Sequence, residues 1–124
     1  MDQQFNLKTD VRDECLVLTT SGYINNVGGE AIAAECLSHV GRGIKDVVLN
    51  LEQSKVVNSI GMSYLIEVIE QLQEIGGTLM FTNLDPAVEK MLAIMGLFTY
   101  AGKERTVDDA LAALVRNGLG KGKG

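Results

Sequence analysis

The sequence predicts an α/β fold in which helices pack on a mixed, mostly parallel sheet of four to five strands. Short β-branched runs alternate along the chain with amphipathic helical patterns. Parallel strands need crossover connections, which helices usually supply. A length of 124 residues is enough for one domain with a single core. We therefore expect about four helices in the order β-β-α-β-α-β-α-(β)-α.

Two strands are expected at the start of the chain. Residues 5–11 alternate apolar and polar side chains, which is the period of a half-buried strand. Residues 12–14 have the composition of a turn, and residues 15–24 then resemble a more buried strand. The two runs together predict an antiparallel pair.

The first helix is expected to follow Gly28 and Gly29, because apolar residues then recur at helical spacing until Gly41 ends the pattern. Residues 45–51 come next. They form a short β-branched run, which is typical of a central strand covered on both faces.

The second helix has the clearest pattern. Gly76 and Gly77 end it, and residues 78–82 have the composition of the next strand. Glutamates occupy its polar face, and its apolar stripe consists of Met62, Leu65, Ile66, Ile69 and Leu72.

The third helix is expected to begin with Asp85 as its cap and Pro86 in its first position. Its apolar stripe of Met91, Leu92 and Met95 is predicted to face the core rather than to form a binding surface.

The end of the chain predicts two further elements. Residues 97–100 could form a short edge strand, and the pair Thr106 and Asp109 has the spacing of a capping box that opens a last helix. We expect the domain to span residues 1–116 and residues 117–124 to be a flexible Gly/Lys tail.

Composition excludes several classes of protein. The formal net charge of −5 argues against contact with nucleic acid or anionic membranes. No apolar run approaches the roughly 20 residues that span a bilayer, and the N-terminus lacks a signal-peptide pattern. Cys15 and Cys36 lack metal-ligand spacing and are predicted to be buried. We expect a soluble, cytoplasmic protein.

Catalysis is not expected. His39, the single histidine, falls in a helical pattern at the border of the apolar stripe, and no glycine-rich phosphate loop is present. We therefore predict a protein that is not an enzyme and that has no cofactor or metal.

The junction before the second helix is the candidate site. The simplest interpretation is that Asn58 or Ser59 caps the helix. Three features favour more than a cap. Val56, Val57 and Ile60 are apolar in a connection that should face solvent, Gly61 could let another chain approach, and a phosphate on Ser59 would lie at the positive end of the helix dipole.

This junction resembles the STAS domain of anti-sigma factor antagonists. That family has Asp-Ser-Ser/Thr-Gly and an apolar residue after the third strand, where this chain has Asn58-Ser59-Ile60-Gly61-Met62. After the second strand the family has Gly-x-Leu-Asp, where this chain has Gly22-Tyr23-Ile24-Asn25. The similarity spans residues 5–115, and it implies a STAS-like single domain.

The resemblance implies a switch rather than a catalyst. It implies binding to an anti-sigma factor, often itself a serine kinase, to release a sigma factor, with phosphorylation at Ser59 ending the interaction and a phosphatase restoring it. The implied partner surface consists of Asn25, Asn26, Val27, Lys55, Val56, Val57, Asn58, Ile60, Gly61, Met62 and Ser63. Asn83 and Leu84 could join it, because they follow a strand at the same sheet end.

The family aspartates are replaced by Asn25 and Asn58, which should lie near Ser59. Less negative charge should make a phosphate on Ser59 easier to accept, but carboxylates that could orient the hydroxyl are missing. An alternative is therefore open: a non-phosphorylated STAS scaffold, or a sensor domain with weak nucleotide binding in a stress-signalling complex.

Overall fold

The computed structural model describes residues 4–122 of the chain. Its first five elements are β1 (Asn6–Arg12), β2 (Cys15–Ser21), α1 (Asn26–Val40), β3 (Asp46–Gln53) and α2 (Ser59–Glu74). They are followed by β4 (Thr78–Thr82), α3 (Pro86–Ile94), the 3-10 turn η1 (Leu97–Thr99), β5 (Gly102–Glu104) and α4 (Val107–Gly122). The predicted order of strands and helices is confirmed.

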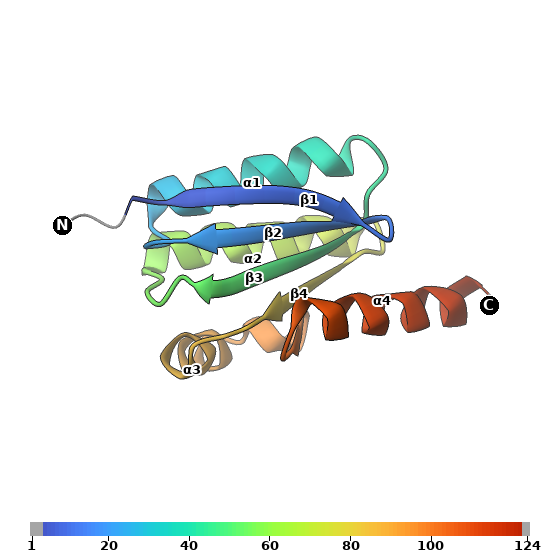
Figure 1. The fold of residues 1–124 in the computed structure, drawn as a ribbon. Coiled ribbons are helices and arrows are strands. Elements are labelled where there is room, and N and C mark those ends of the chain that lie inside the picture. The colour runs from blue at the N-terminus through green and yellow to red at the C-terminus, as the bar shows by residue number, and fades with distance from the viewer. Residues whose placement is uncertain (1–3, 123–124) are drawn as a thin grey trace.

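The five strands form one sheet in the order β1-β2-β3-β4-β5. β1 and β2 are antiparallel, and β2, β3 and β4 run parallel to one another (Figure 1). β5 pairs with β4 in the parallel direction as well. Leu18, Leu49 and Phe81 lie side by side across the three central strands and point to the same face. The expected mixed, mostly parallel α/β sheet is confirmed.

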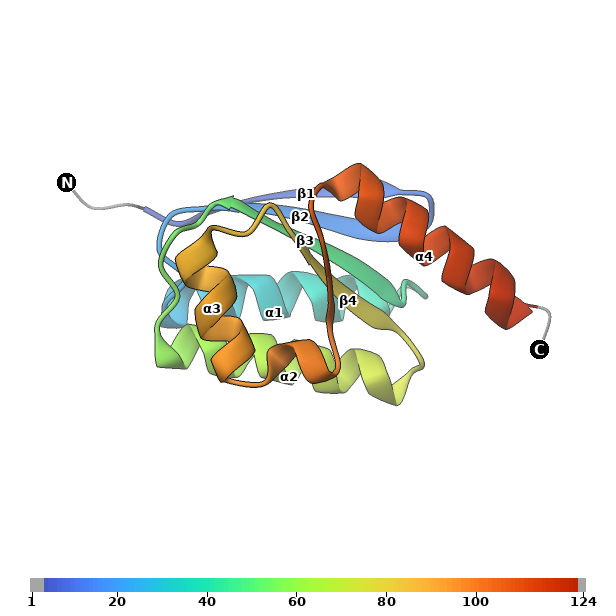
Figure 2. The same ribbon diagram turned by 90° about the horizontal axis from the view of Figure 1, so that it is seen from below.

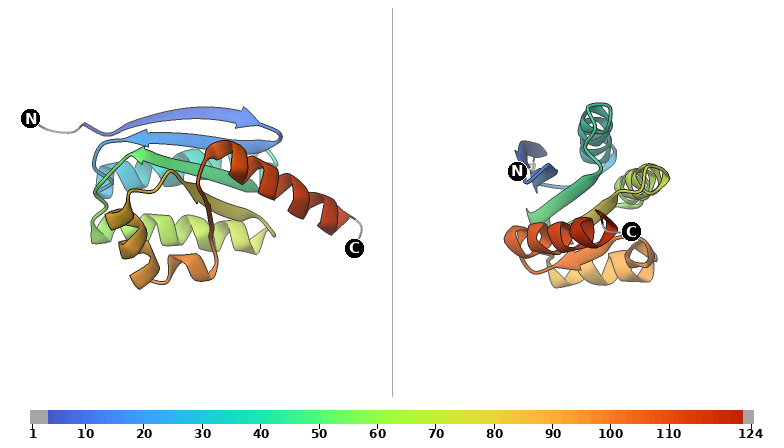
Figure 3. Two further views of the ribbon diagram at one scale, coloured as in Figure 1. Left: turned by 60° about the horizontal axis from the view of Figure 1, so that its bottom comes forward. Right: turned by 90° about the vertical axis from the view of Figure 1, so that its right-hand side faces the viewer.

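Helices cover both faces of the sheet. α1 and α2 lie side by side on one face, and α4 lies on the other (Figure 2). α3 packs on the same face as α2 and lies beside the start of that helix (Figure 3). The larger core lies under α1, α2 and α3, and the smaller one lies between α4 and the side chains of Cys15, Val17, Val48 and Met80.

Most predicted helix starts are confirmed. The Asp85 carboxylate accepts a hydrogen bond from Ala87 N, with Pro86 in the first turn, and Asp109 N donates to Thr106 Oγ1. The start of α1 was predicted too late. The helix begins at Asn26, so Gly28 and Gly29 lie within it. Their lack of a side chain leaves room for Phe5 and Tyr64 to pack against the helix.

The edge strand lies later than predicted. Residues 97–99 form the 3-10 turn η1, which buries Leu97, and the strand is instead β5. The helix α4 continues to Gly122, so the backbone of residues 117–122 is helical there. The flexibility of the tail stays a prediction, and residues 123–124 lie outside the described part of the chain.

Candidate functional site

The connections that follow β2 and β3 run together at one end of the sheet. Ile24 forms a parallel bridge with Val57, supported by hydrogen bonds from Ile24 N to Val56 O (3.0 Å) and from Asn58 N to Ile24 O (3.1 Å). Asn25 and Asn58 directly follow the two bridged residues. The two asparagines therefore start neighbouring helices at the same sheet edge, next to Ser59.

A buried pair of hydroxyl groups holds the connection between β3 and α2. Thr20 Oγ1 lies 2.7 Å from Ser54 Oγ, and both residues are fully buried. The pair ties the start of this connection to the end of β2. A hydrogen bond from Gly22 N to Gln53 O (3.0 Å) supports the same link. The segment of residues 55–59 is therefore anchored to the end of β2 at its start.

Asn58, not Ser59, caps α2. Asn58 Oδ1 accepts a hydrogen bond from Gly61 N at 2.8 Å, and Asn25 Oδ1 accepts from Val27 N and Gly28 N at the start of α1. Ser59 is the first residue of α2 and is exposed. Its hydroxyl makes no hydrogen bond to any residue that the structure describes. The Ser59 hydroxyl is therefore not needed for the cap and can be reached from solvent.

The role expected for Gly61 is corrected by the structure. Gly61 is buried, and a Cβ there would overlap the backbone carbonyl of Ile24. Its small size lets the first turn of α2 pack on the segment that follows β2. It does not open space for a partner beside the hydroxyl.

The predicted partner residues divide by exposure. Asn25 and Asn58 are partly buried; Val57, Gly61 and Met62 are buried and support the surface from beneath. The exposed members are Asn26, Val27, Lys55, Val56, Ile60 and Ser63. Val56 and Ile60 expose 51% and 53% of their surface, so apolar side chains flank Ser59 in solvent. Their contact with a partner stays a prediction.

A pocket of about 280 Å³ lies beside Ser59, lined by Val57, Asn58, Ser59, Met62, Met91 and Met95. Met91 on α3 and Met95 at its C-cap expose 43% and 52% of their surface, so the prediction that they belong to the core was wrong, whereas Leu92 is buried as expected. Sequence reasoning missed them because exposed and buried residues of a short helix can share the same i, i+4 spacing. We call the exposed residues Val27, Val56, Ser59, Ile60, Met91 and Met95 the Ser59 surface.

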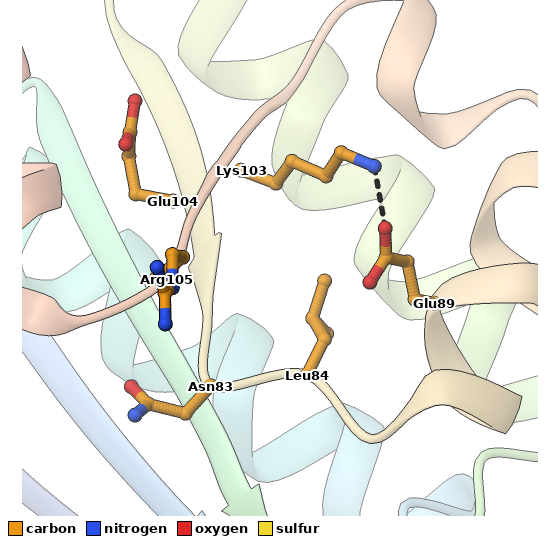
Figure 4. A pocket seen from close by; sticks show the side chains of 6 residues that line it. All are labelled: Asn83, Leu84, Glu89, Lys103, Glu104 and Arg105. Atoms are coloured by element: carbon orange, nitrogen blue, oxygen red, sulfur yellow. Dashed lines mark hydrogen bonds and ion pairs between the residues drawn. The ribbon is translucent and has the colours of Figure 1, made fainter.

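A second, more polar pocket of about 410 Å³ lies at the end of β4, lined by Asn83, Leu84, Glu89, Lys103, Glu104 and Arg105 (Figure 4). The Lys103 ammonium pairs with the Glu89 carboxylate at 2.5 Å. Two basic and two acidic side chains balance each other, so the pocket has no surplus of positive charge. Asn83 and Leu84, the two residues that could join the partner surface, line this pocket, and their contact with a partner stays a prediction.

Other candidate groups have structural roles. His39 is partly buried and its Nδ1 lies 2.9 Å from Glu35 O. Burial raises the pKa of the Cys15 thiol to about 11 and that of the Cys36 thiol to about 12, with nearby carboxylates adding to both shifts. The prediction that both cysteines are buried is confirmed.

Within residues 4–122 no cluster of three or more potential ligands could hold a metal ion. None of the helices described is long and apolar enough to cross a membrane.

Comparison with known proteins gives one family match. Residues 6–110 match the family model described as the STAS domain. The chain is 28% identical over 107 residues to BtrV of Bordetella bronchiseptica, which carries a provisional name as an anti-sigma factor antagonist. The alignment covers 86% of this chain and 92% of BtrV.

Solved structures show the same fold. An anti-sigma factor antagonist from Mycobacterium paratuberculosis superposes with a TM-score of 0.77 at 24% identity, covering 89% of this chain and 93% of its own. The Bacillus cell fate determinant SpoIIAA in its phosphorylated form superposes with a TM-score of 0.69 at 20% identity, covering 90% and 99%. At these identities the likeness concerns the fold.

Proposed function

Because the chain belongs to the STAS domain family, we propose that it is an anti-sigma factor antagonist, which binds an anti-sigma factor and so releases a sigma factor. The observation that carries the proposal is the exposed Ser59 at the start of α2, with a hydroxyl that the helix cap does not use and with exposed apolar side chains around it. The name of BtrV supports it as well.

We propose that the partner is a serine kinase and that Ser59 is its target. A phosphate adds about −1.5 to −2 charge units at neutral pH. In the complex this charge would have to lose its water among apolar groups such as Val56 and Ile60, which opposes binding. In the free protein the N-terminus of α2 favours negative charge. Phosphorylation would therefore release the partner while the fold persists, until a phosphatase removes the phosphate.

Asn25 and Asn58 bear on how this switch would work. Each side-chain oxygen accepts backbone hydrogen bonds at a helix start, which an aspartate could do equally well. The family pattern has aspartate at both positions, so this chain has less negative charge beside Ser59. We infer that the asparagines keep the caps and reduce the repulsion that a phosphate on Ser59 would meet.

The decisive experiment compares three variants for binding to the anti-sigma factor kinase of the same organism. Ser59→Asp should weaken binding at least about tenfold because it places a charge in the apolar surface. Ser38→Asp places the same charge on an exposed serine of α1, outside the Ser59 surface, and should bind like the wild type. Ser59→Ala should bind but resist phosphorylation, as mapped by mass spectrometry after incubation with kinase and ATP.

Two results would refute the switch. One is equal labelling of wild type and Ser59→Ala, and the other is equal loss of binding in Ser59→Asp and Ser38→Asp.

The alternative function is a scaffold or nucleotide-sensing STAS domain that is not phosphorylated. The absence of carboxylates at Asn25 and Asn58 favours it, since a kinase would have to act without them. The polar pocket at Asn83 is the space for a small ligand, although its balanced charges do not favour a triphosphate. A rise in melting temperature with GTP or ATP in the absence of kinase would support this alternative.

A further inference from the structure

The sulfur atoms of this protein are distributed unequally between core and surface. Among the methionines that the structure describes, Met62 and Met80 expose 2% and 6% of their surface. Met91 and Met95 expose 43% and 52%, and both line the pocket beside Ser59. Met1 lies outside the described residues. Among the described methionines, an oxidant in solvent would therefore reach those of the Ser59 surface first.

The two cysteines do not compete for the oxidant. Cys15 and Cys36 expose 4% and 2% of their surface and lie in the two core clusters. Their raised pKa values of about 11 and about 12 leave about one thiol in ten thousand, or fewer, ionised at pH 7. Because the thiolate is the reactive form, both cysteines are protected from oxidation by their burial and by remaining protonated.

We propose that Met91 and Met95 are an oxidation site through which peroxides reduce the apolar character of the Ser59 surface. In each step hydrogen peroxide transfers one oxygen atom to the thioether sulfur. The O–O bond breaks, an S–O bond forms, the sulfur loses two electrons, and the peroxide is reduced to water. The product is methionine sulfoxide, which is polar and which methionine sulfoxide reductases can reverse.

The position of the two residues gives the oxidation its consequence. Met91 lies on α3, Met95 caps the C-terminus of that helix one turn later, and both line the pocket of about 280 Å³ together with Ser59. A sulfoxide dipole there would have to be desolvated in any complex that covers the pocket. This consequence rests on the proposed function, whereas the selectivity of oxidation does not.

The experiment uses the full chain and hydrogen peroxide and needs no partner. Peptide mapping by mass spectrometry should show sulfoxide at Met91 and Met95 at least about tenfold faster than at Met62 and Met80. Retention on a hydrophobic interaction column should decrease after treatment. The matched variant Met91→Leu/Met95→Leu keeps apolar side chains of similar volume, and its retention should be the same before and after peroxide.

The proposal would be overturned by oxidation of Met62 or Met80 at the same rate as Met91, by an equal change of retention in the leucine variant, or by selective oxidation with no change of retention in the wild type. Circular dichroism after treatment separates surface oxidation from unfolding, and loss of the native spectrum at the rate of sulfoxide formation also counts against it. A failed kinase assay would leave all these results unaffected, so the two proposals can fail separately.

Discussion

The oxygen of Asn58 decides what Ser59 is free to do. By accepting the hydrogen bond from Gly61 N it satisfies one of the unpaired donors at the start of α2, so the cap does not use the neighbouring Ser59 hydroxyl. An aspartate at position 58 could cap α2 in the same way and would also leave the Ser59 hydroxyl outside the cap. The substitution by asparagine changes the charge near Ser59 and leaves the cap geometry in place.

Replacement of Asn58 tests whether its side chain stabilises the start of α2. Asn58→Ala removes the acceptor and should lower the free energy of unfolding by about 1 kcal/mol. Asn58→Asp keeps an acceptor and places a negative charge at a helix N-terminus, so it should be at least as stable as the wild type. Urea denaturation of the three proteins provides the measurement. Equal stability of Asn58→Ala and wild type would show that the cap has no energetic role.

At the residue scale the sequence predicted the candidate serine and its two neighbouring asparagines, because strand ends and helix starts can be located from composition. It could not tell the buried Val57 from the exposed Val56 and Ile60. Val56 and Val57 lie in the irregular connection before α2, and Ile60 lies in the first turn of that helix, where no period yet indicates which side faces the core. It also assigned Met91 and Met95 to the core, because the exposure of these residues depends on how α3 and its C-cap lie against α2.

At the scale of elements, the packing of α2 on the segment after β2 positions the site. The first turn of α2 packs against the Ile24 carbonyl at Gly61, and Ile24 also forms the bridge with Val57 just before that helix. The exposed start of α2 is therefore rigidly attached to the sheet. A rigid surface loses little conformational entropy when a partner binds.

Substitution of Gly61 should disturb this contact. In Gly61→Ala the new methyl group meets backbone rather than a movable side chain, so α2 must shift, and we expect a loss of roughly 2–4 kcal/mol of unfolding free energy. Gly41→Ala is the matched control. Gly41 has α-helical φ and ψ angles and only ordinary contacts for a Cβ, so its stability should stay within about 1 kcal/mol of the wild type.

Thermal and urea unfolding of both glycine variants gives the comparison. If Gly61→Ala unfolds at the same urea concentration as Gly41→Ala, the close packing of α2 on Ile24 is not a requirement of the fold.

The misplaced edge strand shows a limit of sequence reasoning at this scale. Residues 97–100 are apolar and aromatic, as strands often are, but Leu97 and Phe98 use these side chains to cover the core. Phe98 meets Phe81 edge to face, with 5.9 Å between ring centroids. β5 is short, contains Lys103 and Glu104, and lies at the sheet edge, so its charged sequence lacks the alternation that predicts a strand.

For the whole molecule, the sheet separates two cores of different size, and each contains one cysteine. Cys36 belongs to the larger core beneath α1 and α2, and Cys15 to the smaller core beneath α4. Strand and helix patterns predicted this layered class, since strands joined by helical crossovers must be covered on both faces. The division of helices between the faces could not be predicted, because every amphipathic helix fits either face.

The two buried thiols make the free energy of unfolding decrease with rising pH in the alkaline range. Their pKa values in the folded protein, about 11 and about 12, lie above the ordinary value of 9.0, so the folded state holds protons that the unfolded state releases. Their stabilising contribution is full below pH 9 and decreases as the pH rises toward 11 and 12. Between pH 8 and pH 10 the loss should be roughly 2–3 kcal/mol for both thiols together.

The contribution of each core can be separated by measuring urea unfolding at pH 8 and pH 10 for the wild type, Cys15→Ala and Cys36→Ala. Each substitution lowers stability at both pH values, but it should remove about half of the loss that the two thiols cause, because the rest of the chain is the same in all three proteins. The change between the two pH values is therefore the quantity to compare. A pH dependence that is the same in all three proteins would mean that neither thiol is held in a buried, protonated state.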